Sequence, residues 1–139
     1  MSGAAVAYKC RTQDITSLSS TESELIAVDE ATRALRYLLK LLRDFGVPVE
    51  EPVLVGQDNM STIALINSTH FNPRTRHLAL RYHHCGEQQR EGVLKIGHLP
   101  TEHMAADVLT KALGRAAFDR HRAVLMGHQR IVWLLLDED

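Results

Sequence analysis

The most regular pattern of apolar residues lies in the first third of the chain. Apolar side chains recur there every three or four residues, which is the spacing of one face of an amphipathic helix. They are Leu25, Val28, Ala31, Leu35, Leu38, Leu42 and Phe45. Most polar residues of the segment fall on the other side, namely Asp29, Glu30, Arg33, Arg36, Lys40 and Arg43. Two pairs have the spacing of a capping box before this pattern, Ser19 with Glu22 and Thr21 with Glu24. The pattern predicts a long helix that stops at Gly46.

Shorter patterns predict that strands alternate with further helices. The run 52–56 is short and wholly apolar, which is typical of a strand covered on both faces. The other expected strands are 4–8, 14–18 and 93–99. The expected helices after the long one are 60–66, 75–91, 104–113 and 116–126. This alternation predicts an α/β layer fold.

Composition narrows the class of protein. The chain has 139 residues and a net charge of -1, so we expect one domain without a global basic field, and any nucleic-acid-binding face must be local. The longest apolar stretch, 131–136, is far shorter than the roughly 20 residues of a membrane helix. The first residues show no signal peptide. We therefore expect no membrane association, a cytoplasmic or nuclear location, and free thiols at Cys10 and Cys85.

Three acidic residues are notable for their positions. Glu24 opens the long predicted helix, Asp58 directly follows a predicted strand, and Asp107 opens a later predicted helix. Magnesium is usually held by one or two carboxylates and keeps several waters. Two such ions can clamp the attacking and leaving oxygens of a phosphodiester. Each residue taken alone is equally typical of a helix N-terminus or a turn, where acidic side chains are stabilised without any metal.

Four segments, in order, resemble the ribonuclease H domain of copia-type retrotransposon Pol polyproteins. Residues 5–24 read AVAYKCRTQDITSLSSTESE, similar to AVSWKSKKQSTVALSSTEAE of that family. Residues 57–59 (QDN) match its CDN motif, and 72–83 (NPRTRHLALRYH) resemble SRTKHIDIRYH. Residues 99–111 (LPTEHMAADVLTK) resemble VPTEDQLADILTK. The resemblance covers about 5–127.

This resemblance implies a fold, an activity and a set of site residues. The fold would be a ribonuclease H-like mixed sheet flanked by helices. The activity would be hydrolysis of the RNA strand of RNA–DNA hybrids with Mg2+ or Mn2+, without a covalent intermediate. Glu24, Asp58 and Asp107 would be the catalytic, metal-holding residues. Glu22 is a competing candidate, and Glu24 is preferred because Leu-Ile-Ala follows it directly, as it follows the ligand in ribonuclease H domains.

Basic and imidazole side chains complete the implied site. The residues expected to contact nucleic-acid phosphates are Arg74, Arg76, His77, Arg81 and Lys111. A solvated helix face explains the first four equally well, and a favourable position near a helix C-terminus explains Lys111. His103, or His98, would assist product release. His77, His83, His84 and Cys85 fit no zinc spacing, so we do not expect zinc there.

The match departs from the family pattern at its start. In the family the first catalytic aspartate lies on the first strand, upstream of the segment matched by 5–24, so this chain is expected to lack the first two strands and that aspartate. Asp14 is not expected to substitute for it. The predicted organisation is a partial ribonuclease H-like domain over 1–127, with a tail over 128–139 outside the resemblance.

The sequence therefore leaves open whether this chain is active as a nuclease. One reading is a nuclease that meets an RNA–DNA hybrid or another nucleic acid. The alternative is an inactive relic or a domesticated domain that binds nucleic acid or forms a structural subunit of a larger assembly. An exposed sheet edge would then invite a protein partner or a second copy of the chain.

Overall fold

The computed structural model describes residues 3–10, 19–68, 76 and 78–129. The chain divides into two compact units. One comprises Ile15–His98, and the other combines Met1–Asp14 with Leu99–Asp139. No helix in the described segments is long and apolar enough to cross a membrane.

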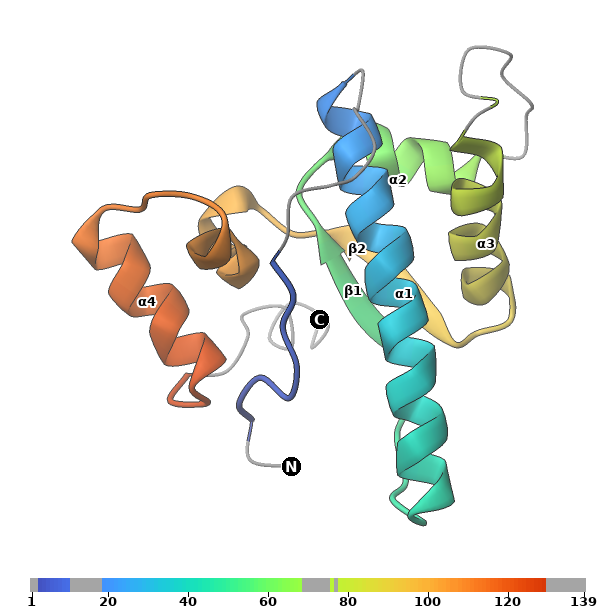
Figure 1. The fold of residues 1–139 in the computed structure, drawn as a ribbon, viewed down its shortest axis with the longest axis horizontal. Helices are drawn as coiled ribbons and strands as arrows, with labels where there is room; N and C mark the ends of the chain where they lie inside the picture. Colours follow the sequence, from blue (N-terminus) through green and yellow to red (C-terminus); the bar gives the residue numbers. More distant parts are fainter. Residues whose placement is uncertain (1–2, 11–18, 69–75, 77, 130–139) are drawn as a thin grey trace, which may run out of the picture. The chain divides into compact units, whose positions relative to one another are not determined.

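The long predicted helix is confirmed as α1, Ser20–Asp44 (Figure 1). Ser19 caps its N-terminus, where the side chain accepts a hydrogen bond from the Glu22 N–H over 3.2 Å. The helix ends because Gly46 adopts φ +70°, a conformation that residues with a Cβ rarely adopt, and its N–H bonds the Arg43 carbonyl over 2.9 Å. Both ends are therefore determined by the residues that the sequence pattern indicated.

In the described part of this unit, the sheet has two parallel strands, β1 (Val53–Gln57) and β2 (Leu94–His98). Two helices connect them, α2 (Met60–Asn67) and α3 (Ala79–Arg90) (Figure 1). The expectation of an α/β fold is confirmed. The first four residues of β1 are half-buried, so the strand predicted to be covered on both faces is only partly covered in this unit.

The core of this unit lies where α1, α2 and α3 pack around the sheet. Its buried members are Leu25, Val28, Ile66, Leu78, Tyr82, Cys85, Leu94 and Ile96. Helices α2 and α3 approach closely at Gly86, because a Cβ there would lie 3.0 Å from the Ile66 carbonyl oxygen. Of the apolar face predicted for α1, Leu25 and Val28 are buried in this core and Leu35 packs against it. Ala31 and Phe45 of the same predicted face are exposed.

The second unit contains less regular structure than predicted. A helix was expected over 104–113, but the chain forms two 3-10 turns, η2 (Thr101–His103) and η3 (Ala105–Leu109), followed by α4 (Arg115–Leu125). The N–H groups of Asp107 and Thr110 bond the carbonyls three residues before them, those of Met104 and Asp107, over 3.1 and 3.0 Å. This is the hydrogen-bond spacing of a 3-10 helix rather than of an α-helix.

Two other boundaries differ from expectation. The strand predicted at 4–8 is absent, although the Ala5 N–H bonds the Leu125 carbonyl over 2.8 Å. A strand requires a neighbour along its length, which local residue pattern does not supply. The α-helix predicted over 75–91 is described only from Ala79. Residues 14–18 and most of the tail, 130–139, lie outside the described part of the chain.

Candidate functional site

Glu24 and the end of β1 are joined by a side-chain hydrogen bond. Glu24 lies in the second turn of α1 and is half-buried. The buried side chain of Gln57, the last residue of β1, donates from Nε2 to Glu24 Oε2 over 3.3 Å. Asp58, the next residue, is also half-buried. The structure thus brings Glu24 and the Asp58 segment to the same end of the unit.

The segment that carries Asp58 is held by further hydrogen bonds. Gln57 Oε1 accepts from the Asn59 N–H over 2.9 Å. Asn59 caps α2 by accepting from the Thr62 N–H over 3.1 Å. Thr62 Oγ1 donates to the Thr21 carbonyl of α1 over 3.3 Å. These bonds fix the backbone on both sides of Asp58. The sequence offered one signal for Gln57, which occupies the cysteine position of the family's CDN motif.

Exposure separates Glu24 from its competitor Glu22. Glu22 is 4% exposed, whereas Glu24 is half-buried and reaches a polar side chain. Magnesium bound to protein usually keeps several waters. Glu24 and Asp58 are both half-buried, and their carboxylate oxygens are donors of the kind that bind magnesium or manganese.

Asp107 belongs to the other compact unit. It lies in η3 and is largely buried. Its Oδ2 forms an ion pair with Lys111 Nζ at 2.8 Å. Lys111, expected to contact phosphate, is therefore engaged with the carboxylate one turn before it.

Two histidines of this unit also have defined surroundings. His103 Nε2 lies 3.4 Å from Oε1 of Glu102, the preceding residue. Burial, with the charge of Arg120, lowers the pKa of His121 in the same unit.

The basic cluster is only partly described. Arg76 is exposed, while Arg74 and His77 lie outside the described residues. Arg81 is half-buried and donates from Nη1 to Asp29 Oδ2 over 3.0 Å. Its guanidinium is thus used within the protein, an arrangement that neither the phosphate-contact prediction nor the solvated-face alternative included.

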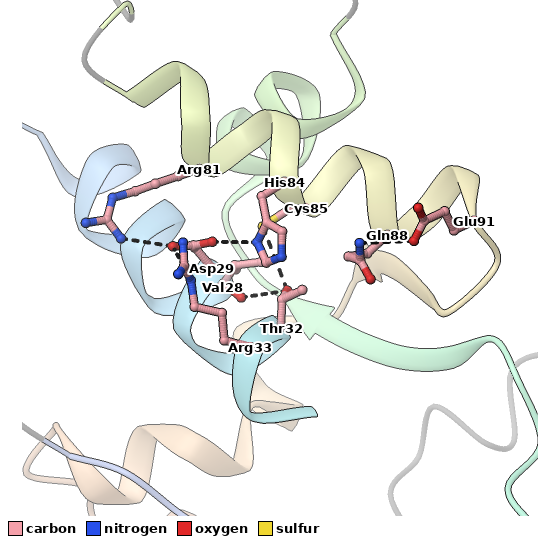
Figure 2. A network of polar contacts seen from close by, with 9 residues as sticks. All are labelled: Val28, Asp29, Thr32, Arg33, Arg81, His84, Cys85, Gln88 and Glu91. Carbon is pink, nitrogen blue, oxygen red and sulfur yellow. Dashed lines mark hydrogen bonds and ion pairs between the residues drawn. The ribbon is translucent and has the colours of Figure 1, made fainter. Parts of the chain in front are cut away.

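Asp29 lies at the centre of a network that sequence reasoning missed (Figure 2). The apolar pattern put Asp29 among the polar residues opposite the core, but its exposed fraction is 0%. Its Oδ2 also accepts from Arg33 Nε over 3.3 Å, and its Oδ1 lies 2.8 Å from His84 Nδ1. A carboxylate only accepts, so His84 Nδ1 carries the proton. Two guanidinium groups and an imidazole thus compensate one buried charge.

Cys85 is adjacent to this network on α3. It is fully buried, and Thr32 Oγ1 of α1 lies 3.8 Å from its sulfur. Burial raises the pKa of the Cys85 thiol from 9.0 to about 11. Cys10 is exposed, and both cysteines are free, as expected. Within the described part of the chain, one set of three His, Cys, Asp or Glu side chains has its ligand atoms within 4.8 Å of one another, namely Asp29, His84 and Cys85.

Comparison with known proteins gives relatives of one kind. The chain is 35% identical over 100 residues to the retrovirus-related Pol polyprotein from transposon RE2 of Arabidopsis thaliana, a match covering 72% of this chain and 7% of that protein. It is 33% identical over 118 residues to the corresponding polyprotein from transposon TNT 1-94 of Nicotiana tabacum, covering 85% and 9%.

The matched part is thus a small fraction of those polyproteins. No protein-family model matches the chain, and no solved structure does. The identity extends over most of the chain and recurs in polyproteins of two plant species. The chain is therefore a relative of one segment of the retrovirus-related Pol polyproteins of copia-type transposons.

Proposed function

We propose that this chain is a ribonuclease H-like segment that hydrolyses the RNA strand of an RNA–DNA hybrid with Mg2+ or Mn2+. The observation that carries the proposal is the hydrogen bond from Gln57 to Glu24. It ties the glutamate of one family motif to the residue directly before Asp58, the aspartate of another. The polyprotein relatives provide a nucleic-acid-processing context for such chemistry.

Glu24 and Asp58 have the donor chemistry and solvent access that a hard divalent cation requires. Bound there, such a cation would supply positive charge to activate water and stabilise the leaving oxygen. The Gln57 amide orients Glu24 by bonding one of its oxygens and leaves the other for a ligand. Asp107 enters the proposal as the third carboxylate through its family motif. Arg76 is an exposed cation suited to a phosphate contact.

A second candidate function is nucleic-acid binding without cleavage. The ion pair of Lys111 with Asp107 favours it, because this carboxylate already has a cationic partner within the protein. A domain of this kind would keep the fold and bind phosphates without holding metal at Asp107.

The test is cleavage of an end-labelled RNA–DNA hybrid by the purified chain with Mg2+ and, separately, Mn2+. Wild-type protein should cut the RNA strand, while Asp58→Asn and Glu24→Gln should lower the rate by at least about 100-fold. Glu22→Gln is the matched control, two residues from Glu24 on the same helix, and should retain activity. An RNA–RNA duplex should resist cleavage.

Absence of cleavage by a chain with helical circular dichroism would exclude the nuclease function for this protein. Retained binding of the hybrid in the same preparation would then support the non-catalytic alternative. Equal activity of Glu22→Gln and Glu24→Gln would remove Glu24 from the proposed site.

A further inference from the structure

Asp29, His84 and Cys85 bring three kinds of metal-ligating atom together away from the proposed carboxylate site. The carboxylate comes from α1, and the imidazole and thiol come from α3 (Figure 2). Asp29 and Cys85 are fully buried, while the side chain of His84 is 21% exposed at the edge of the cluster. Spacing along the chain argued against zinc because His77, His83, His84 and Cys85 fit no zinc pattern, but the structure adds a donor from another helix. That donor, Asp29, lies 55 residues earlier in the chain.

We propose that Asp29 Oδ1, His84 Nδ1 and Cys85 Sγ bind one Zn2+ ion, which fastens α1 to α3. Oxygen, nitrogen and sulfur donors together suit a borderline-soft ion, in contrast to the all-oxygen chemistry of Glu24 and Asp58. The partly exposed edge at His84 provides entry for the ion and a position for water as fourth ligand. The site goes beyond the proposed nuclease function and does not depend on it.

The two carboxylate oxygens of Asp29 have different hydrogen-bond partners. Arg33 and Arg81 both bond Oδ2, whereas His84 bonds Oδ1. An ion bound at Oδ1 therefore replaces one hydrogen bond and leaves both arginine contacts in place. Partners of this kind orient a ligating carboxylate and are a regular part of protein metal sites.

His84 and Cys85, which are neighbours on α3, both contact side chains in the same part of α1. His84 contacts Asp29 at 2.8 Å, and Cys85 Sγ lies 3.8 Å from Thr32 Oγ1, one turn further along α1. Zinc bonds of about 2.0 Å to nitrogen and about 2.3 Å to sulfur require ligand atoms a few ångströms apart. The three donor atoms lie within 4.8 Å of one another, and the 2.8 Å contact between His84 Nδ1 and Asp29 Oδ1 must open by about half an ångström to admit the ion.

Proton and charge balance follow from these positions. On binding, the Cys85 thiol releases its proton to solvent, and a His84 imidazole that carries one proton moves it from Nδ1 to Nε2. No electron transfer is involved. For that form of His84, two positive charges arrive and one proton leaves, so the cluster gains one charge. The Arg33 side chain is 65% exposed, so its charge stays largely hydrated. A hydrogen bond from Thr32 to the new thiolate would replace the bond that its hydroxyl now donates to the Val28 carbonyl over 2.8 Å.

Binding should strengthen as pH rises. The reason is that the Cys85 thiol must lose its proton to bind the ion.

The experiment uses Co2+ as a spectroscopic substitute for Zn2+, with the full chain kept reduced. Titration at about pH 8 should give one Co2+ per chain and the near-ultraviolet absorption of a thiolate–cobalt bond. Added Zn2+ should remove that absorption and raise the melting temperature. Cys85→Ser should abolish the absorption, and His84→Asn should weaken binding by more than about tenfold.

Two matched variants should bind as wild type does. They are Cys10→Ser, at the other cysteine, and His83→Asn, one residue from His84 on the exposed side of α3. Absence of the absorption in a wild-type chain with helical circular dichroism would overturn the proposal without reference to any variant. The same holds for an absorption that persists in Cys85→Ser or vanishes in Cys10→Ser. Asp58→Asn should leave cobalt binding unchanged, so failure of the nuclease proposal is measured separately.

Discussion

Arg81 of α3 donates a hydrogen bond to the carboxylate of Asp29 on α1 over 3.0 Å, and the Asp29 side chain has no contact with solvent. The bond joins two helices whose sequence positions are 52 residues apart. With Arg33 and His84, it compensates a buried charge that would be costly alone. This network accounts for an aspartate in the middle of a helix, at a position expected to face water.

Replacement of Asp29 should destabilise the fold. Asp29→Asn removes the negative charge and leaves Arg81 half-buried without its carboxylate, so the free energy of unfolding should fall by about 3–5 kcal/mol. Urea denaturation followed by circular dichroism measures the change. Asp44→Asn, at the exposed end of the same helix, should change it by less than about 0.5 kcal/mol. Equal effects of the two variants would contradict a stabilising role of the network.

The two arginines that bond Asp29 should differ in their contribution. The Arg81 side chain is 28% exposed, so Arg81→Met should cost about 1–3 kcal/mol of stability. Arg33 is mostly exposed, and water screens its pair, so Arg33→Met should cost about 0–1 kcal/mol. Raising the salt concentration should weaken the Arg33 contribution more. A larger loss of stability for Arg33→Met than for Arg81→Met would show that burial does not determine which arginine contributes more.

Helices α2 and α3 should not tolerate a side chain at Gly86. A Cβ there would lie 3.0 Å from the Ile66 carbonyl oxygen, so Gly86→Ala should force the helices apart and cost about 1–3 kcal/mol. Thermal denaturation provides the measurement. Gly114→Ala is the steric control, because nothing lies within 4 Å of a Cβ there. Gly114 caps α4, and alanine is a poorer N-cap, so this variant should cost no more than about 1 kcal/mol. A neutral Gly86→Ala would mean that the helices are less closely packed.

Cys85 should react slowly with thiol reagents in the native, metal-free chain. Its pKa of about 11, against an ordinary value of 9.0, reduces the thiolate fraction near neutral pH about 100-fold, and burial excludes the reagent as well. Disulfide-exchange labelling should therefore modify Cys10 first and Cys85 only after unfolding. Fast labelling of Cys85 in Cys10→Ser would contradict the burial of this thiol.

The raised pKa of Cys85 also predicts a loss of folding stability at alkaline pH. The folded chain retains the Cys85 proton between about pH 9 and pH 11, whereas the unfolded chain releases it. Stability from this group is therefore fully present below about pH 9 and lost as pH rises toward 11. The free energy of unfolding measured across this range should fall less steeply in Cys85→Ala than in wild type. Parallel curves would exclude the contribution.

Gln57 should position Glu24 without taking part in the chemistry. Gln57→Leu removes the hydrogen bonds to Glu24 and from the Asn59 N–H, so the Mg2+ concentration for half-maximal cleavage should rise. The leucine still fills the buried position at the end of β1. Gln57→Glu should be worse, because it puts a second carboxylate against Glu24. Cleavage assays across a range of Mg2+ concentrations measure both. A uniform loss of activity with an unchanged Mg2+ requirement would indicate a structural role for Gln57.

The elements predicted well are those determined by local residues. Helix α1 has its apolar period, the Ser19 cap and Gly46 within one stretch of chain, so the sequence pattern located it closely. Asp58 was likewise expected directly after a strand, and it follows β1. The predictions at 4–8 and 104–113 were wrong. A strand depends on a distant neighbour, and the later segment forms 3-10 hydrogen bonds, a difference that apolar spacing alone does not distinguish from an α-helix.

By itself, the sequence determined the α/β alternation, the ends of α1 and the motifs that relate the chain to transposon Pol polyproteins. These depend on periodicity, capping and residue identity, which act over a few positions. Only the tertiary structure decided that Asp29 is buried, that Arg81 bonds it and that Cys85 lies beside them. Such contacts arise when α1 packs on α3, and the cost of burying a charge then selects partners that no local pattern contains.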